Sequence, residues 1–181
     1  MRLTNRIALV TGASRGIGRA TALALAAEGA HVIAVARTVG GLEELDDAIK
    51  KAGGGATLVP LDLRDGAAFP RLAGAVAERW KKLDILIGNA GVLHDLTPVA
   101  HINPKHWIEA FDVNVNANLR LIQFFDPLAH LESAAIVGAQ HAGILHVDEK
   151  ARVERIKIEP ALRPLLIIID TPEYRRQTHH L

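Results

Sequence analysis

The feature that most constrains this chain is a glycine-rich turn between two apolar stretches near its start. An apolar run at residues 7–10 precedes the segment Thr11-Gly12-Ala13-Ser14-Arg15-Gly16-Ile17-Gly18, and an alanine- and leucine-rich run follows at residues 20–27. This order predicts a strand, a tight turn and a helix. Such a turn presents bare backbone N–H groups and the positive end of a helix, where the phosphates of a dinucleotide bind. Glycines also serve ordinary turns, and that is the alternative interpretation.

The composition fits one globular domain and excludes several classes of function. The chain has 181 residues, 49% of them hydrophobic, and a formal net charge of +1 at pH 7. A charge this small gives no general attraction to nucleic acid or to an anionic membrane, so neither is an expected partner. The absence of cysteine excludes disulfides, thiolate metal sites and a cysteine nucleophile. The histidines show no HExxH spacing, so no metal site is predicted. The first strand begins too early for a signal peptide, which favours a cytoplasmic location.

Short apolar runs alternate with helical segments along most of the chain. Strands are predicted at residues 7–10, 31–36, 57–61, 85–87 and 134–137. Helices are predicted at residues 17–28, 42–52, 67–80 and from 103 to about 126. This alternation predicts an α/β fold, a Rossmann-type doubly wound parallel sheet with helices on both faces. Pro60 lacks an N–H, so the third strand requires a special position in the sheet.

The longest predicted helix has a clear beginning and an apolar stripe. Asn103 is a suitable cap, Pro104 fits the first turn and Pro127 ends the helix. The stripe, at near-helical spacing, comprises Trp107, Phe111, Val115, Leu119 and Ile122. We interpret it as a face that packs into the core.

The alternation weakens after the fifth predicted strand. Residues 146–155 fit a short charged helix, residues 155–159 alternate like an edge strand and residues 165–169 resemble a buried strand. We therefore divide the chain into a dinucleotide-binding domain at residues 1–138 and an atypical segment at residues 139–181 that packs on the same domain.

The end of the second predicted strand favours one nicotinamide cofactor over the other. NAD sites of this type place a carboxylate there, against the ribose 2′-hydroxyl. This chain has Arg37-Thr38 at that point, and Arg15 lies in the glycine turn. Two guanidinium groups can hold a 2′-phosphate through charge-assisted bonds, so NADP(H) is predicted over NAD(H). The alternative is that either arginine simply extends into solvent.

Together these motifs resemble the short-chain dehydrogenase/reductase family over residues 1 to about 128. Residues 11–18 resemble the TGxxxGxG signature, and Asp62-Leu63 resembles the family's adenine-contacting pair. Gly88-Asn89-Ala90-Gly91 resembles the NNAG motif, with Gly88 in place of the first asparagine. The resemblance implies a Rossmann-type sheet, a nicotinamide dinucleotide, a carbonyl/alcohol substrate pair and, usually, a homo-oligomer.

The glycine turn and the resemblance together define a candidate site. The predicted cofactor-binding residues are Gly12, Ser14, Arg15, Gly16, Ile17, Gly18, Arg37, Thr38, Asp62, Leu63, Asn89, Ala90 and Gly91. The resemblance also implies that Asn114 bends its helix locally and holds a water in a proton relay. Asn116 and Asn118 lie close enough in sequence for that assignment to shift to one of them.

The family's proton chemistry has no obvious counterpart in this sequence. The family uses a tyrosine, a lysine four residues later and a serine after the fifth strand. Tyr174 is the only tyrosine, Thr178 stands four residues later, and residues 138–141 contain no serine.

His146 and Lys150 have the tyrosine–lysine spacing and form a candidate substitute, because an imidazole can move a proton. Ser133 lies before the fifth strand, which is the wrong end for a site at the carboxyl edge of the sheet. The alternative is that His146 and Lys150 belong to an exposed charged helix.

Three functions follow from these observations. The first is a short-chain-type oxidoreductase that transfers hydride between NADP(H) and a carbonyl or alcohol. The second is a non-catalytic NADP(H)-binding module or a truncated member of the family. The third is an assembly protein whose segment 139–181 completes the sheet of a partner.

Overall fold

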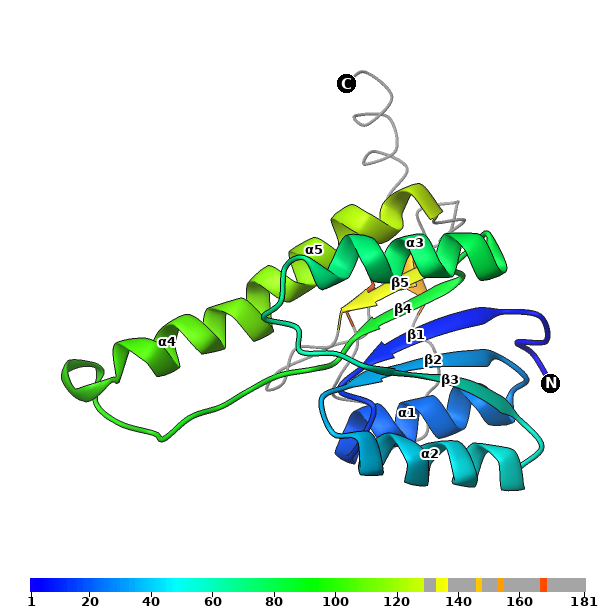
Figure 1. The fold of residues 1–181 in the computed structure, drawn as a ribbon, viewed down its shortest axis with the longest axis horizontal. Helices are drawn as coiled ribbons and strands as arrows, with labels where there is room; N and C mark the ends of the chain where they lie inside the picture. The colour runs from blue at the N-terminus through cyan, green and yellow to red at the C-terminus, as the bar shows by residue number, and fades with distance from the viewer. Residues whose placement is uncertain (129–132, 137–145, 148–152, 155–166, 169–181) are drawn as a thin grey trace, which may run out of the picture.

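The computed structural model describes residues 1–128, 133–136, 146–147, 153–154 and 167–168, and its centre is a six-stranded sheet (Figure 1). The strands are β1 (Ile7–Thr11), β2 (His31–Ala36), β3 (Gly55–Pro60), β4 (Ile85–Gly88), β5 (Ser133–Ile136) and β8 (Ile167–Ile168). Their order across the sheet is β3-β2-β1-β4-β5-β8. The pairs from β3 to β5 are all parallel. The predicted Rossmann-type α/β fold is confirmed.

The strand order reverses between β1 and β4, and this reversal determines where a crevice forms. The chain moves outward from β1 to β2 and β3, and then returns to pair β4 with the other side of β1. The loops that leave the carboxyl ends of β1 and β4 therefore diverge, which opens a crevice at that edge. Every residue of β1 is buried, as expected for a parallel strand covered on both faces.

Helices cover both faces of the sheet. α1 (Gly16–Ala27) and α2 (Val39–Lys51) lie on one face, and α3 (Ala68–Trp80) and α5 (Ala117–Phe125) lie on the other (Figure 1). Leu45 and Ile49 of α2 belong to the first core, while Phe69 of α3 and Phe125 of α5 belong to the second. No described helix is both long and apolar enough to cross a lipid bilayer.

The proline in β3 occupies the special position that the sequence requires. Pro60 is the last residue of β3, and β3 is the outer strand of the sheet. It lies opposite Ala36 at the end of β2. The missing N–H therefore interrupts no ladder in the interior of the sheet.

One prediction for the later part of the chain is wrong. His146–Val147 (β6) and Val153–Glu154 (β7) pair as antiparallel strands, so these four residues do not belong to the helix predicted at 146–155. Within the strand predicted at 165–169 the structure describes β8, which pairs antiparallel with β5 at the edge of the otherwise parallel sheet. The other residues between 137 and 181, including the predicted edge strand at 155–159, lie outside the described residues.

The long helix begins as predicted but contains a π-helical segment. The Asn103 side chain accepts a hydrogen bond from the Lys105 amide at 3.0 Å, and Pro104 occupies the first turn. α4 (Pro104–Phe111) continues into the π-helix η2 (Asp112–Asn116) and then into α5. Short 3₁₀ turns lie on either side, η1 (Val99–His101) before α4 and η3 (Asp126–Leu128) after α5.

The predicted core face of this helix is on the wrong side. Trp107, Phe111, Val115 and Leu119 are 45–55% exposed. The residues that enter the core are instead Val113, Ala117, Leu121 and Phe125. The helix is apolar on two faces, and periodicity alone does not say which one meets the sheet. In Figure 1 α4 extends well beyond the edge of the sheet, which leaves its apolar side chains uncovered by the described residues.

A buried carboxylate joins the amino ends of β1 and β4. Asp84, 4% exposed, accepts hydrogen bonds from the Ile7 amide and the Arg6 guanidinium, both at 2.8 Å. Lys82 Nζ lies 2.9 Å from the same carboxylate. Burial alone would raise the pKa of Asp84, but the hydrogen bonds from Arg6, Ile7 and Lys82 together lower it below its usual value.

We expect Asp84→Asn to lower the free energy of unfolding by about 2 kcal/mol at pH 7, because the charge-assisted hydrogen bonds are lost. The folded-state pKa is depressed, so the advantage of the native protein is present above the unfolded pKa of about 4 and disappears as the pH falls through the lower folded value. Urea unfolding of both proteins between pH 7 and pH 2 measures this difference. Asp65→Asn, at an exposed ion pair, is the control. A difference in the free energy of unfolding between the two proteins that stays constant from pH 7 to pH 2 would contradict the prediction.

Candidate functional site

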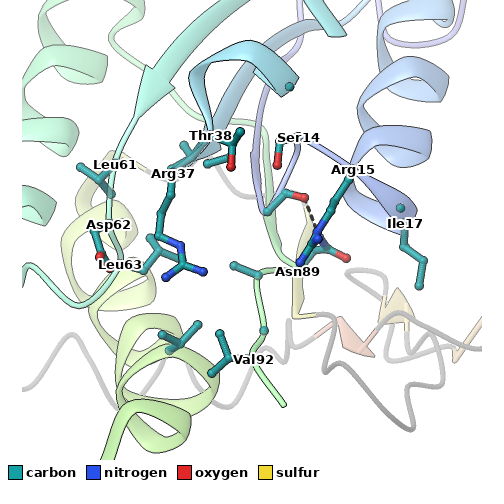
Figure 2. Close-up of a pocket in the computed structure, with 18 residues that line it drawn as sticks. Ser14, Arg15, Ile17, Arg37, Thr38, Leu61, Asp62, Leu63, Asn89 and Val92 are labelled. Carbon is teal, nitrogen blue, oxygen red and sulfur yellow. Dashed lines mark hydrogen bonds between the residues drawn. The ribbon is translucent and has the colours of Figure 1, made fainter. Parts of the chain in front are cut away.

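A pocket of about 500 Å³ lies at the carboxyl edge of the sheet, at the reversal of strand order (Figure 2). Its walls come from the segments that follow β1, β2, β3 and β4. Of the thirteen predicted cofactor-binding residues, all but Gly18 line this pocket. The fold thus brings together four segments that are far apart in the sequence.

The three glycines of the first turn have three different environments. Gly12 and Gly16 adopt φ angles of +65° and +56°, which glycine favours. A Cβ on Gly16 would meet no atom of the described residues within 4 Å, so its backbone faces the pocket. A Cβ on Gly18 would lie 2.3 Å from the Gly12 carbonyl oxygen, so Gly18 allows α1 to pack against the end of β1.

The beginning of α1 suits an anion. Among the described residues no side chain caps this helix end, and the first turn of α1 contains no acidic residue. The free N–H groups and the positive end of the helix dipole therefore face the pocket without a competing carboxylate. The open space beside Gly16 would admit a phosphate there, so the residues present fit a dinucleotide.

Hydrogen bonds join the loop after β1 to the loop after β4. Thr11 Oγ1 accepts from the amides of Asn89 and Ala90, each at 3.0 Å, and donates to the Ile87 carbonyl at 3.3 Å. The Asn89 side-chain amide donates to the carbonyls of Thr11 at 2.9 Å and Gly12 at 3.4 Å, and Figure 2 marks the latter bond. This network fixes the width of the crevice.

The two predicted phosphate-binding arginines approach the pocket from different walls. Arg37 follows β2 and lies beside Asp62 and Leu63, whereas Arg15 lies across the pocket near Asn89 (Figure 2). Arg37 is 55% exposed. The Arg37 guanidinium therefore provides a positive charge that a ligand in the pocket can reach.

A network of charges lies behind the wall of the pocket that contains Arg37 and Asp62. Arg64 donates from Nε to both carboxylate oxygens of Asp62 at 3.0 Å and from Nη1 to Glu109 at 3.1 Å. The hydrogen bonds from Arg64 lower the pKa of Asp62, so its carboxylate is charged at neutral pH. Glu109 also lies 3.9 Å from Arg37 and 3.6 Å from His94. The His94 ring stacks on that of His106 with centroids 4.2 Å apart.

Of the three asparagines in the long helix, Asn114 is the one bonded to the wall of the pocket. Its side chain accepts from the Val92 amide at 2.9 Å and donates to the Val92 carbonyl at 3.0 Å. Asn116 bonds instead to Asp112 at 2.9 Å, and Asn118 donates to the Asn114 carbonyl at 2.8 Å. Asn114 lies in the π-helix, which agrees with the predicted local distortion.

The structure does not support His146 and Lys150 as a substitute for the family's tyrosine and lysine. The pairing of β6 with β7 removes the helical face that His146 and Lys150 would share, and Lys150 lies outside the described residues. Ser133 is opposite Ile85 at the amino end of β4, the end away from the pocket, as predicted. Tyr174 also lies outside the described residues. The described part of the chain holds no group of three or more metal-ligating side chains.

Sequence reasoning missed several residues of the site. Thr11 belongs to the predicted glycine-turn motif, but the motif does not indicate that its hydroxyl holds the loop after β4. Gly41 of α2 lies against Ser14, where a Cβ would come within 2.9 Å of the Ser14 Cβ. The pair Gly40-Gly41 at a helix start is a signal that could have found it. Val113 lines the pocket from η2 and is indistinguishable in sequence from its apolar neighbours.

A family model described as short chain dehydrogenase matches residues 6–139. The chain belongs to the short-chain dehydrogenase family. Sorbitol dehydrogenase of Cereibacter sphaeroides is 34% identical over 151 residues, which cover 83% of this chain and 55% of that protein. The chain thus spans about half the length of the curated relatives that it matches.

Two solved structures of relatives hold different cofactors. A metagenomic short-chain oxidoreductase in complex with NADP is 36% identical, with a TM-score of 0.69 over 71% of this chain and 58% of that one. Carveol dehydrogenase from Mycobacterium avium in complex with NAD is 28% identical, with a TM-score of 0.65 over 70% of this chain and 50% of that one. The fold is therefore common to relatives that bind either nicotinamide dinucleotide.

We expect Gly18→Ala to lower the free energy of unfolding by about 1–3 kcal/mol, because the added Cβ overlaps the Gly12 carbonyl and forces α1 away from β1. Gly74→Ala in α3 is the matched control, since its Cβ would meet no atom within 4 Å in the part of the chain that the structure describes. That substitution should raise stability by about 0.5–1 kcal/mol through helix propensity alone. Equal effects of the two variants in urea unfolding would contradict the role assigned to Gly18.

Proposed function

We propose that the pocket binds a nicotinamide dinucleotide, with NADP(H) preferred to NAD(H), and serves a short-chain dehydrogenase acting on a carbonyl/alcohol pair. The observation that carries this proposal is the uncapped beginning of α1, beside Gly16, open to a pocket that Arg15 and Arg37 also line. NADP(H), when bound, supplies or accepts the hydride. The complexes of relatives with NADP and with NAD support the choice of cofactor class.

The preference for NADP follows from the charge at the end of β2. A carboxylate there would favour a ribose 2′-hydroxyl, whereas this chain has Arg37. The half-exposed guanidinium of Arg37 borders the pocket and can form charge-assisted bonds to a 2′-phosphate. Asp62 and Leu63 on the same wall would contact the adenine.

We infer that Asn114 positions the loop after β4 beside the nicotinamide ribose. The two bonds between Asn114 and Val92 support this role, because they hold the loop that contains Ala90 and Gly91. A water held at this point would serve a proton relay.

A non-catalytic NADP(H)-binding module is the second candidate function. It is favoured by the sequence around Tyr174, where no lysine follows at the fourth position. Oxidation of NADPH with a panel of carbonyl compounds, measured beside binding, separates the two functions. Turnover supports the dehydrogenase, while binding without turnover supports the module.

We expect the full chain to bind NADP more tightly than NAD in isothermal titration calorimetry. Arg37→Gln should weaken NADP binding about tenfold or more and leave NAD binding nearly unchanged, since only the 2′-phosphate loses a charge-assisted bond. Arg71→Gln removes the same charge from an exposed ion pair outside the pocket and is the control. Equal or tighter binding of NAD by the native chain would contradict the preference.

We also propose that a second copy of the chain covers the exposed apolar face of the long helix formed by α4, η2 and α5. The face comprises Trp107, Phe111, Val115 and Leu119, each 45–55% exposed. Several exposed apolar side chains at near-helical spacing support an interaction surface here. This proposal specifies the surface of the homo-oligomer that the sequence predicts. An assembly through residues 139–181 is the alternative. The cytoplasmic location predicted from the sequence remains a separate proposal.

We expect Leu119→Lys to convert the oligomer to a monomer in light scattering, because it places a charge in the apolar interface. Val39→Lys is the control, since Val39 is 50% exposed on α2 away from this face. An unchanged mass for Leu119→Lys, together with a loss of association on removal of residues 139–181, would favour the alternative.

A further inference from the structure

Four charged side chains from three segments of the chain meet at one wall of the pocket. Arg37 follows β2, Asp62 and Arg64 follow β3, and Glu109 is in α4. Arg64 contacts both carboxylates, with hydrogen bonds of 3.0 Å to Asp62 and 3.1 Å to Glu109. Arg37 and Asp62 line the pocket, whereas Arg64 and Glu109 do not.

The two arginines are held to different degrees. Arg64 is fixed between two carboxylates by hydrogen bonds, whereas Arg37 lies 3.9 Å from Glu109 Oε1 and acts on Asp62 through its charge. The 3.9 Å distance to Glu109 is too long for a hydrogen bond, so charge attraction joins Arg37 to this carboxylate. The same oxygen of Glu109 already accepts from Arg64 and therefore keeps a partner if Arg37 turns toward a ligand.

The charges within this group of four are balanced, and Asp112 also acts on Arg64 through its charge. Arg64 and Arg37 carry two positive charges, and Asp62 and Glu109 carry two negative charges. Without Arg64, both carboxylates would attract Arg37, and their uncompensated charge would repel a phosphate dianion nearby. His94, 3.6 Å from Glu109, is the other titratable group in contact with this carboxylate that the structure describes.

We propose that Arg64 is a specificity-determining residue that neutralises Asp62 and Glu109 and thereby leaves Arg37 available to the 2′-phosphate of NADP. The inference rests on the proposed function and extends it to two residues outside the pocket lining. Arg64 acts through Arg37 and through the local field, and it does not touch the cofactor.

The test compares dissociation constants for NADP and NAD, measured by isothermal titration calorimetry on the full chain. Arg64→Gln should reduce the preference for NADP over NAD by about three- to tenfold, and Glu109→Gln should increase it by a similar factor. The double variant restores the charge balance, so its preference should lie within about twofold of the native value. The ratio isolates the 2′-phosphate because both cofactors share the pyrophosphate.

Arg71→Gln and Glu28→Gln are matched controls, since each removes the same charge from an exposed pair outside the pocket. Neither should change the ratio. If Arg64→Gln unfolds, Glu109→Gln and the double variant still carry the test.

The outcomes separate this inference from the proposed function. Binding of neither cofactor by the native chain overturns both. Native binding with an unchanged ratio in Arg64→Gln and Glu109→Gln, or a lower preference for NADP in Glu109→Gln, overturns the role of Arg64 alone. Opposite shifts in the two single variants, with recovery in the double variant, support it.

Discussion

The hydrogen bonds between Thr11 and the loop that begins at Asn89 are the interaction on which the rest of the site depends. They join β1 to β4 at the carboxyl edge, where the order of the strands reverses. The backbone of the glycine turn and the backbone after β4 form opposite walls of the pocket, so this contact determines their separation. At the other end of the same two strands, Asp84 binds the Ile7 amide and the Arg6 side chain. The central strand pair is thus fastened at both ends, and the crevice opens between rigid elements.

The long helix is the second structural support of the pocket. Val113 lines it, Asn114 holds Val92, and Glu109 reaches the charges beside Arg37. These contacts come from α4 and the π-helical segment, while α5 packs against the sheet through Leu121 and Phe125. One helix therefore connects the core, the pocket wall and an exposed apolar face.

The fold and most of the pocket lining could be predicted from the sequence because their signals are local. The glycine turn, the apolar strand runs and the Asn103 cap each depend on neighbouring residues, and the structure contains all three. The orientation of the long helix could not be predicted, because it is apolar on two faces and burial is decided by the sheet. The bond between Arg64 and Glu109 joins residues 45 positions apart, and no local pattern indicates it. The strands at 146–147 and 153–154 form by pairing with each other, which a helical spacing of charges does not reveal.

A crystal structure of the full chain with NADP tests the central claim most directly. The account predicts the pyrophosphate at the beginning of α1 beside Gly16, with the 2′-phosphate in contact with Arg37 and the Thr11–Asn89 bonds intact. A cofactor bound elsewhere on the chain, or a 2′-phosphate directed away from Arg37 into solvent, would contradict it.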